Sequence, residues 1–260
     1  MAQVTYTNEN DKWYADFDNR KKTLWKERWI SPIDMPEPTP SVEKGQIITM
    51  NIDGSDKQWR VLKVNGNIVE VVGMSDANSS IQFDSNNTNT YAGKTLDNWL
   101  NGTYYDTFTS TAKEAIVDKT FTQDSWYRDN TGNPDYNGKH TNGDYQISLA
   151  SATYGTEITR HVYALSVQDI IDYLEVTPEM TTSNTTLTYT NIFKMFWNDE
   201  QTHSGQYLWL RSALASFSFR AFYVLGDYGF LSSNGASSIF RARAALTIDL
   251  SKIEWTPAVE

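Results

Sequence analysis

Side chains that commonly carry chemistry are few in this sequence of 260 residues. Its three histidines, His140, His161 and His203, have no second ligand at a spacing typical of metal sites. No Gly-x-Ser-x-Gly motif accompanies them, as one type of Ser-His-Asp hydrolase needs. Cysteine is absent, which excludes disulfides, thiol nucleophiles and thiolate metal sites. We therefore interpret the histidines as structural or solvent-exposed, and we predict that the chain is not an enzyme.

One polar loop has oxygen-bearing side chains at alternate positions, as calcium-binding loops do: Asp129, Thr131, Asn133 and Asp135. Position twelve is His140, where such a loop needs a bidentate glutamate. We predict no cofactor and no metal, and leave open whether calcium binds between Asp129 and Asp144. Two carboxylate pairs lie in turn or surface contexts and are assigned no acid/base role: Asp53 with Asp56, and Asp16 with Asp18.

The charge pattern argues against a nucleic-acid partner. The formal net charge is -10, and neutralising phosphates needs a cluster of Lys and Arg. The densest basic stretch, residues 20–28, is interpreted as a solvated or docking helix. No apolar run approaches the roughly 20 residues of a membrane span, and the first ten residues lack the pattern of a secretory signal. We expect no nucleic-acid partner and no membrane insertion, and leave export open.

Four prolines divide the chain, at positions 32, 36, 38 and 40. They predict an extended linker, so residues 1–41 are expected to be an N-terminal extension and residues 42–260 one domain. The extension contains Trp13, Trp25 and Trp29 but is too small for a core of its own. We expect it to pack on the main domain or on a partner.

The main domain is predicted to run from strands through helices back to strands. Asn65-Gly66 between two β-rich runs predicts a hairpin over residues 58–72. Four helices are predicted. The first begins at Thr95 and stops at Gly102, and the second follows a capping box of Thr111 with Glu114. The other two are predicted over 166–174 and 192–197. Residues 124–144 are predicted to form a loop.

Beyond position 207, short strands separated by glycines are expected, the last over 244–250. This order predicts an α+β fold with the first and last strands in one sheet.

Seven short motifs follow one another over about 200 residues: Trp59-Arg60-Val61-Leu62, Tyr91-Ala92-Gly93, Trp99-Leu100-Asn101, Tyr104-Tyr105, Tyr163-Ala164-Leu165-Ser166, Trp209-Leu210-Arg211-Ser212 and Arg243-Ala244-Ala245-Leu246. The ordered set resembles a family of bacterial and phage proteins with the C-type lectin-like fold, which includes the variable proteins of diversity-generating retroelements. Ala244 stands where that family more often has proline, which leaves the subfamily open.

The resemblance implies that adenine-specific mutation diversifies AAY codons to NNY, which cannot encode Trp, Met, Lys, Gln or Glu. These types make up 49 of the 260 residues, yet none occurs in residues 211–247. Random placement would leave such a gap roughly 4 times in 10,000, before allowing for our choice of window. A buried β-rich segment would also avoid Lys, Gln and Glu, but less readily Trp and Met. We expect a variable region over about residues 211–243.

Within this region we distinguish two sets of positions. Expected scaffold positions are Trp209, Leu210, Arg211, Val224, Gly226, Gly229, Arg243, Ala245 and Leu246. Expected ligand-facing positions are Phe217, Phe219, Arg220, Phe222, Tyr223, Leu225, Tyr228, Phe230, Ser238, Ile239 and Phe240. Aromatic rings interleaved with serines are also the composition of antibody paratopes.

The resemblance thus implies a hypervariable ligand- or receptor-binding protein, a phage or cell-surface adhesin. Its ligand would be a bacterial surface protein or glycan, and its location a bacteriophage virion or the outside of a cell. The alternative is a non-variable structural or attachment module of a virion or envelope, which predicts that Phe217, Phe222 and Phe240 are all buried. An enzyme of the formylglycine-generating class, which shares this fold class, relies on cysteines that this chain lacks. The oligomeric state is left open.

Overall fold

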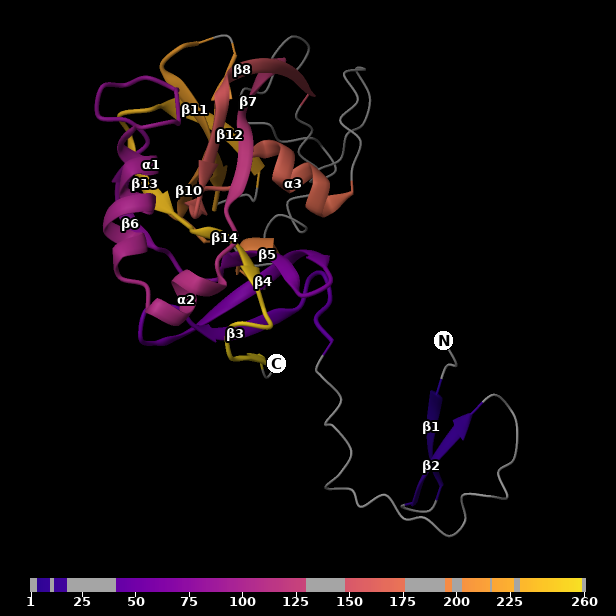
Figure 1. Cartoon of the computed structure of the whole chain (residues 1–260). Helices are drawn as coiled ribbons and strands as arrows, with labels where there is room; N and C mark the ends of the chain where they lie inside the picture. The colour runs from indigo at the N-terminus through magenta and orange to yellow at the C-terminus, as the bar shows by residue number, and fades with distance from the viewer. Residues whose placement is uncertain are drawn as a thin grey trace. The chain divides into compact units, whose positions relative to one another are not determined.

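The structure is a computed structural model that describes residues 4–9, 12–17, 41–129, 148–175, 195–197, 203–215, 217–226 and 230–258. The chain divides into two compact units, Met1–Ser41 and Val42–Glu260. The first contains the antiparallel hairpin of β1 (Val4–Glu9) and β2 (Lys12–Phe17) (Figure 1). Docking of this unit stays a prediction, and residues 20–40 lie outside the described part. The second unit is α+β and mostly β.

A six-stranded sheet contains both the first and the last strands of the second unit, as predicted. Its order is β15 (Trp255–Pro257), β3 (Ile47–Asn51), β4 (Asp56–Asn65), β5 (Ile68–Gly73), β14 (Ala245–Asp249) and β9 (Val162–Tyr163). The predicted hairpin is confirmed as β4 and β5. Because Asn65 pairs with Ile68, the turn consists of Gly66 and Asn67, and Gly66 adopts a φ of 60°.

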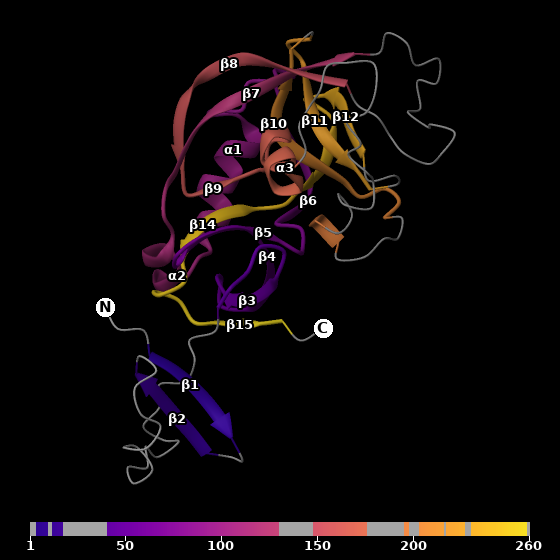
Figure 2. The same cartoon turned by 90° about the vertical axis from the view of Figure 1, so that its right-hand side faces the viewer.

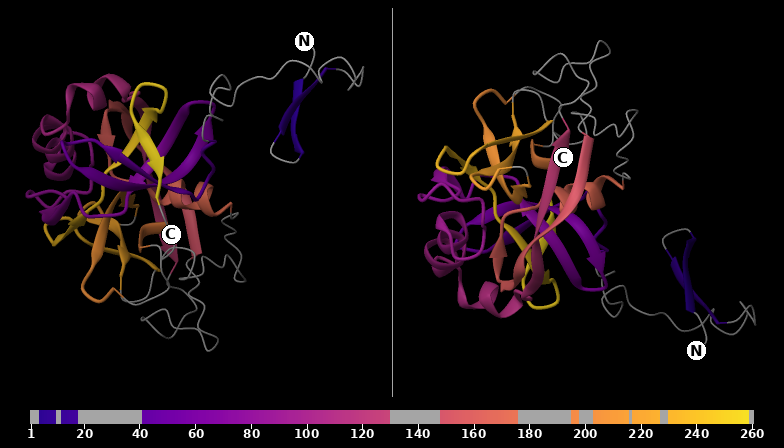
Figure 3. Two further views of the ribbon diagram at one scale, coloured as in Figure 1. Left: turned by 90° about the horizontal axis from the view of Figure 1, so that it is seen from below. Right: turned by 90° about the horizontal axis from the view of Figure 1, so that it is seen from above.

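A seven-stranded sheet forms the other end of the unit (Figure 1). Five strands run in the order β12 (Phe230–Gly235), β11 (Arg220–Leu225), β10 (Tyr207–Leu214), β13 (Ile239–Ala242) and β6 (Asn78–Gln82). Strand β7 (Lys119–Asp129) pairs with β10 and with β8 (Ser148–Arg160). Strands β7 and β8 form a long two-stranded ribbon (Figures 2 and 3).

The ribbon corrects the prediction of a loop from residue 124. Residues 124–129 continue β7 despite their polar composition, because their main chain pairs with β8 and β10: Ser125 lies opposite both Ala152 and Ala213. Residues 130–147 lie outside the described part, so the candidate calcium loop is described only at its first residue, Asp129.

Helices flank the sheets, with α1 (Thr95–Trp99) and α2 (Ser110–Ala115) on one side and α3 (Val167–Leu174) on the other (Figure 1). The predicted stop at Gly102 is wrong, since α1 continues as the π-helix η1 (Leu100–Tyr104). Leu100 and Tyr104 are buried, so packing outweighs the glycine. The predicted capping box of Thr111 with Glu114 is wrong. The N-cap of α2 is Thr109, two residues earlier, and its hydroxyl accepts a hydrogen bond from the N–H of Ala112 (3.1 Å).

The prediction of α3 is confirmed together with its cap. Ser166 and Asp169 form a capping box in which each side chain accepts a hydrogen bond from the other's main-chain N–H. Residues 195–197 are helical, whereas the start of the helix predicted over 192–197 lies outside the described residues. None of the helices in the described ranges is long and apolar enough to cross a membrane.

Candidate functional site

The motif Trp209-Leu210-Arg211-Ser212 connects β10 to α3 and β7. A guanidinium nitrogen of Arg211 donates to Ala164 O (2.7 Å) and to the carboxylate of Asp169 (2.5 Å). The Ser212 hydroxyl donates to Asp124 (2.7 Å) and accepts from the N–H of Val167 (2.8 Å). The motif therefore fixes the N-terminal end of α3 against the second sheet.

Opposite charges surround Asp169. Burial alone would raise the pKa of its carboxyl, but Arg211 and Lys119 outweigh burial and hold that pKa well below its usual range. Burial would likewise lower the pKa of Lys119, but Asp169 and Glu70 together raise it. Asp169 and Lys119 therefore stay charged at neutral pH, and we interpret Asp169 as a structural counterion.

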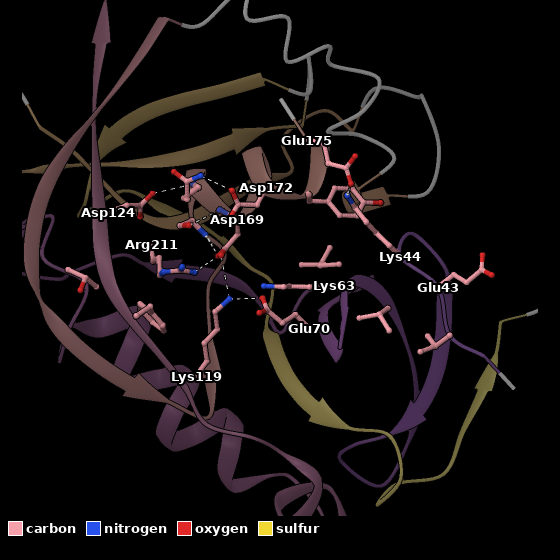
Figure 4. A pocket seen from close by; sticks show the side chains of 18 residues that line it. Glu43, Lys44, Lys63, Glu70, Lys119, Asp124, Asp169, Asp172, Glu175 and Arg211 are labelled. Atoms are coloured by element: carbon pink, nitrogen blue, oxygen red, sulfur yellow. Dashed lines mark hydrogen bonds and ion pairs between the residues drawn. The ribbon is translucent and has the colours of Figure 1, made fainter. Parts of the chain in front are cut away.

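This charged network lines a cavity of about 840 Å³ (Figure 4). Its walls come from β4, β5, β7 and α3, and they include Leu62, Val64 and Phe121 beside the charged groups. Arg211 stacks on the Phe121 ring, with its guanidinium carbon 4.2 Å from the ring centre. No group of three His, Cys, Asp or Glu side chains able to hold a metal occurs among the described residues.

A second feature is a surface formed by two turns, 217–220 and 235–238, and by Ile239, the first residue of β13; we call it the apolar rim. Phe217, Phe219 and Ile239 are 47%, 41% and 61% exposed, and Val64 is the other large apolar side chain exposed in the described part. The Ala236 N–H donates to Phe219 O (2.8 Å), which joins the two turns. The Phe217 and Phe219 rings meet edge to face at 5.7 Å.

Side chains from distant parts of the sequence hold the main chain of the rim. The buried amide of Asn89 donates to the carbonyls of Leu214 (3.2 Å), Phe217 (2.8 Å) and Arg220 (3.1 Å). Gln123 in turn donates to Asn89 O and Arg211 O, both at 2.8 Å. The first turn is therefore fixed through main-chain atoms.

The second turn is fixed in the same way. The Gln82 amide donates to Ser237 O (2.8 Å), and the Asn87 carbonyl accepts from Ser237 N–H (3.1 Å). The sequence reasoning missed Gln82, Asn87, Asn89 and Gln123, because they lie far from the rim along the chain.

The eleven positions predicted to face a ligand divide into four groups. Three are exposed: Phe217, Phe219 and Ile239. Four are partly exposed: Arg220, Leu225, Ser238 and Phe240. Tyr228 and the side chain of Phe230 lie outside the described part.

Phe222 and Tyr223 correct the prediction, since they are 0% and 8% exposed. Strand β11 lies between β10 and β12, and both of its faces are covered, because residues 221–224 are all buried. Phe222 packs in an apolar cluster with Leu210 and Val224, while Tyr223 lies 4.7 Å from the Phe240 ring. Neither side chain faces a ligand.

The expected scaffold positions in the described ranges are all buried: Trp209, Leu210, Arg211, Val224, Gly226, Arg243, Ala245 and Leu246. At Gly226 a Cβ atom would lie 2.4 Å from the carbonyl oxygens of His203 and Gln206, so no larger residue fits. Gly229 lies outside the described residues.

Two of the three histidines are in the described part and have aromatic neighbours. His161 stacks on Tyr105 at 4.5 Å and bonds Asp118, while His203 stacks on Trp197 at 4.8 Å. We interpret both as structural, and His140 lies outside the described ranges.

Comparison with known proteins gives one match. No curated protein and no solved structure matches the chain. The model of a protein family described as a domain of unknown function, DUF6273, matches residues 57–250. The matched residues contain the apolar rim, its supporting side chains and most of the cavity lining. The chain therefore belongs to the DUF6273 family.

Proposed function

We propose that this domain is a binding protein, not an enzyme, and that it recognises a macromolecular ligand through the apolar rim. The observation that carries the proposal is the exposure of Phe217 and Phe219 on one turn and of Ile239 directly after the second turn, to which the first is hydrogen-bonded. Large apolar side chains that gather on a surface are typical of interaction sites. Aromatic anchors contribute much contact area and lose little conformational entropy on binding.

The support of the rim suits a surface whose side chains change. The hydrogen bonds from Gln82, Asn87 and Asn89 end on main-chain atoms of the rim. A new side chain at an exposed position leaves these bonds in place. We therefore propose that a retroelement diversifies the rim, which would also account for the five residue types missing from residues 211–247.

The scaffold that we propose is C-type lectin-like. Its support is the order of strands, helices and strands, the pairing of β14 with β5, and the burial of Trp209, Arg211 and Arg243 from the motifs that carry the resemblance. We place such a protein on a phage virion or on a cell surface.

A protein surface fits the rim better than a glycan does. Sugar rings stack on flat aromatic faces, and their hydroxyls bond to several side-chain amides or carboxylates. The rings of Phe217 and Phe219 are inclined by 69° and share no flat face, and the amides of Asn87 and Asn89 are bonded to main-chain atoms. Projecting apolar side chains match an apolar hollow on a partner protein.

Arg220 adds a charge preference to this surface. Its guanidinium carbon lies 5.6 Å from the centre of the Phe217 ring, and it has no ion pair with any described residue. A carboxylate beside the hollow of the partner would complement it. The structural-module alternative requires Phe217, Phe222 and Phe240 to be buried together, whereas Phe217 is 47% exposed.

Sequencing the neighbouring DNA tests the retroelement part of this proposal. We expect a reverse-transcriptase gene and a near-identical template repeat, with AAY codons opposite the exposed rim positions. Absence of both the gene and the repeat refutes diversification.

Selection from a displayed library of random peptides tests the binding part. The wild-type protein is expected to enrich peptides with an apolar anchor and acidic residues. The triple variant Phe217→Ser, Phe219→Ser, Ile239→Ser is expected to lose them, while keeping its circular dichroism spectrum. Glu114→Ser is the control, because Glu114 is exposed and lies outside both the rim and the cavity. Enrichment of the same peptides by the triple variant contradicts binding through the rim.

A further inference from the structure

Asn234 and Gly235, the last two residues of β12, form a pair that can react with itself. When glycine follows asparagine, the main-chain nitrogen of the glycine can attack the side-chain amide, because no Cβ obstructs the approach. The sequence contains five Asn-Gly pairs, at positions 65, 101, 137, 142 and 234. Asn65 lies in the β4–β5 hairpin and Asn101 in η1, whereas Asn234 adjoins the turn 235–238 of the apolar rim.

The structure holds the two reacting groups of this pair together. The Gly235 N–H donates a hydrogen bond to the side-chain oxygen of Asn234 (2.8 Å). The carbon that the nitrogen would attack is bonded to that oxygen at about 1.23 Å, so nitrogen and carbon are at most about 4 Å apart. Both residues are partly exposed, so water can reach them. Position 234 therefore combines a nearby nucleophile with access to solvent.

The side-chain amide of Asn101 is held differently. Its nitrogen donates to Val162 O (2.8 Å) and to Asp97 O (3.1 Å), and its oxygen accepts from the Val162 N–H (3.2 Å). These hydrogen bonds direct both ends of the amide to residues other than Gly102. Asn101 therefore provides a control within the same chain, with the same following glycine but with the reacting groups kept apart.

We propose that Asn234 is a self-modification site, at which deamidation changes the apolar rim. The nitrogen of Gly235 forms a bond to the side-chain carbon of Asn234, and the side-chain NH2 takes up the proton of that nitrogen and leaves as ammonia. The product is a five-membered succinimide ring. Water then opens the ring at one of its two carbonyl carbons, which gives aspartate or isoaspartate. Water is the only co-reactant.

Both products alter the rim, and their effect on binding rests on the proposed function. Each adds a negative charge next to Gly235, which lies opposite Arg220 in the register of β11 and β12. Isoaspartate also adds one CH2 group to the main chain, directly before the residues that join the two turns through the Ala236 N–H and Phe219 O (2.8 Å). The charge opposes an acidic ligand, and the insertion displaces one turn from the other. We therefore expect binding through the rim to weaken as Asn234 converts.

Incubation of the purified full chain at neutral and at mildly alkaline pH, followed by mass spectrometry of its peptides, tests the modification. We expect Asn234 to convert at least about tenfold faster than Asn101, because its reacting groups are already held together. The conversion should be faster at the higher pH, since the attacking nitrogen must lose its proton. Conversion of Asn234 no faster than that of Asn101 overturns the proposal.

Two variants test the effect on the rim. Asn234→Gln keeps an amide but would have to form a six-membered ring, so it is expected to stay unmodified and to enrich the same displayed peptides before and after incubation. Asn234→Asp carries the new charge from the start. The incubated wild type should lose acidic peptides and approach Asn234→Asp. Equal enrichment by the fresh and the converted wild type overturns the effect on the rim.

The two readouts also separate this proposal from the proposed function. If the fresh wild type enriches no peptide, binding through the rim is refuted. The masses of the peptides that contain Asn234 and Asn101 still decide whether the modification occurs.

Discussion

Phe222 and Phe217 are five positions apart in the sequence, and replacing each by alanine distinguishes a buried core residue from an exposed residue of the rim. Phe222 is fully buried in a cluster with Leu210 and Val224. Truncating such a ring costs about 3–5 kcal/mol, from lost burial and the cavity that remains. Phe217 is 47% exposed and keeps contacts with Phe219 and Arg220. Its truncation is expected to cost about 1 kcal/mol.

Thermal and urea unfolding of the purified variants measure the difference. In a domain of this size each kcal/mol lowers the Tm by roughly 2–4 °C. We therefore expect Phe222→Ala to lower it by roughly 6–20 °C and Phe217→Ala by roughly 2–4 °C. The slope of the urea transition should stay unchanged in Phe217→Ala, since the fold is retained.

The result that would refute this reasoning is a similar loss of stability in both variants. It would mean that Phe217 belongs to the core, and the rim would then lose its main anchor. A small loss in Phe222→Ala would instead show that β11 is covered on one face only.

Three further predictions concern the supports of the site. Asn89→Ala should destabilise the domain by about 1–3 kcal/mol and speed amide hydrogen exchange in residues 214–220, because three carbonyls lose their donor; unchanged exchange there would contradict the role of Asn89. Gly226→Ala should cost about 3 kcal/mol or more in urea unfolding. Gly102→Ala, where a Cβ meets nothing within 4 Å, should be neutral or stabilise η1 by up to about 1 kcal/mol; similar effects of the two changes would exclude crowding at Gly226. Asp169 has a lowered pKa in the folded state, so its contribution is complete above the unfolded pKa of about 3.9 and is lost as the pH falls below it. Asp169→Asn should therefore flatten the fall of Tm between about pH 5 and pH 2, and an unchanged acid limb would show that the ion pair does not govern it.

Local signals predicted the elements that depend on neighbouring residues. The Asn-Gly pair gave the β4–β5 hairpin, and Ser166 with a helical apolar period gave α3 and its cap. The strand from Asp124 to Asp129 was missed, because its pairing partners lie in β8 and β10, far along the chain. Gly102 failed as a stop for the same reason, since burial of its helix outweighs its low propensity.

In the candidate site, too, the sequence predicted what depends on neighbouring residues and missed what depends on contacts between distant parts of the chain. Composition located the rim, and Phe217, Phe219 and Ile239 are exposed. Composition did not distinguish Phe222 from them, because covering by β10 and β12 is a property of the assembled sheet. The cavity was invisible in the sequence, since its walls come from separate stretches whose charges have no common spacing.

The sequence positions of the residues that bond to the rim have a consequence for folding during synthesis. Gln82, Asn87, Asn89 and Gln123 all precede the rim in the chain, and so does β5, the partner of β14. A growing chain leaves the ribosome from its N-terminus. The residues that hold the rim are therefore translated before it, so the main chain of each rim variant can form the same hydrogen bonds as soon as it is made. A set of rim variants is thus expected to fold at similar rates while differing in what they bind.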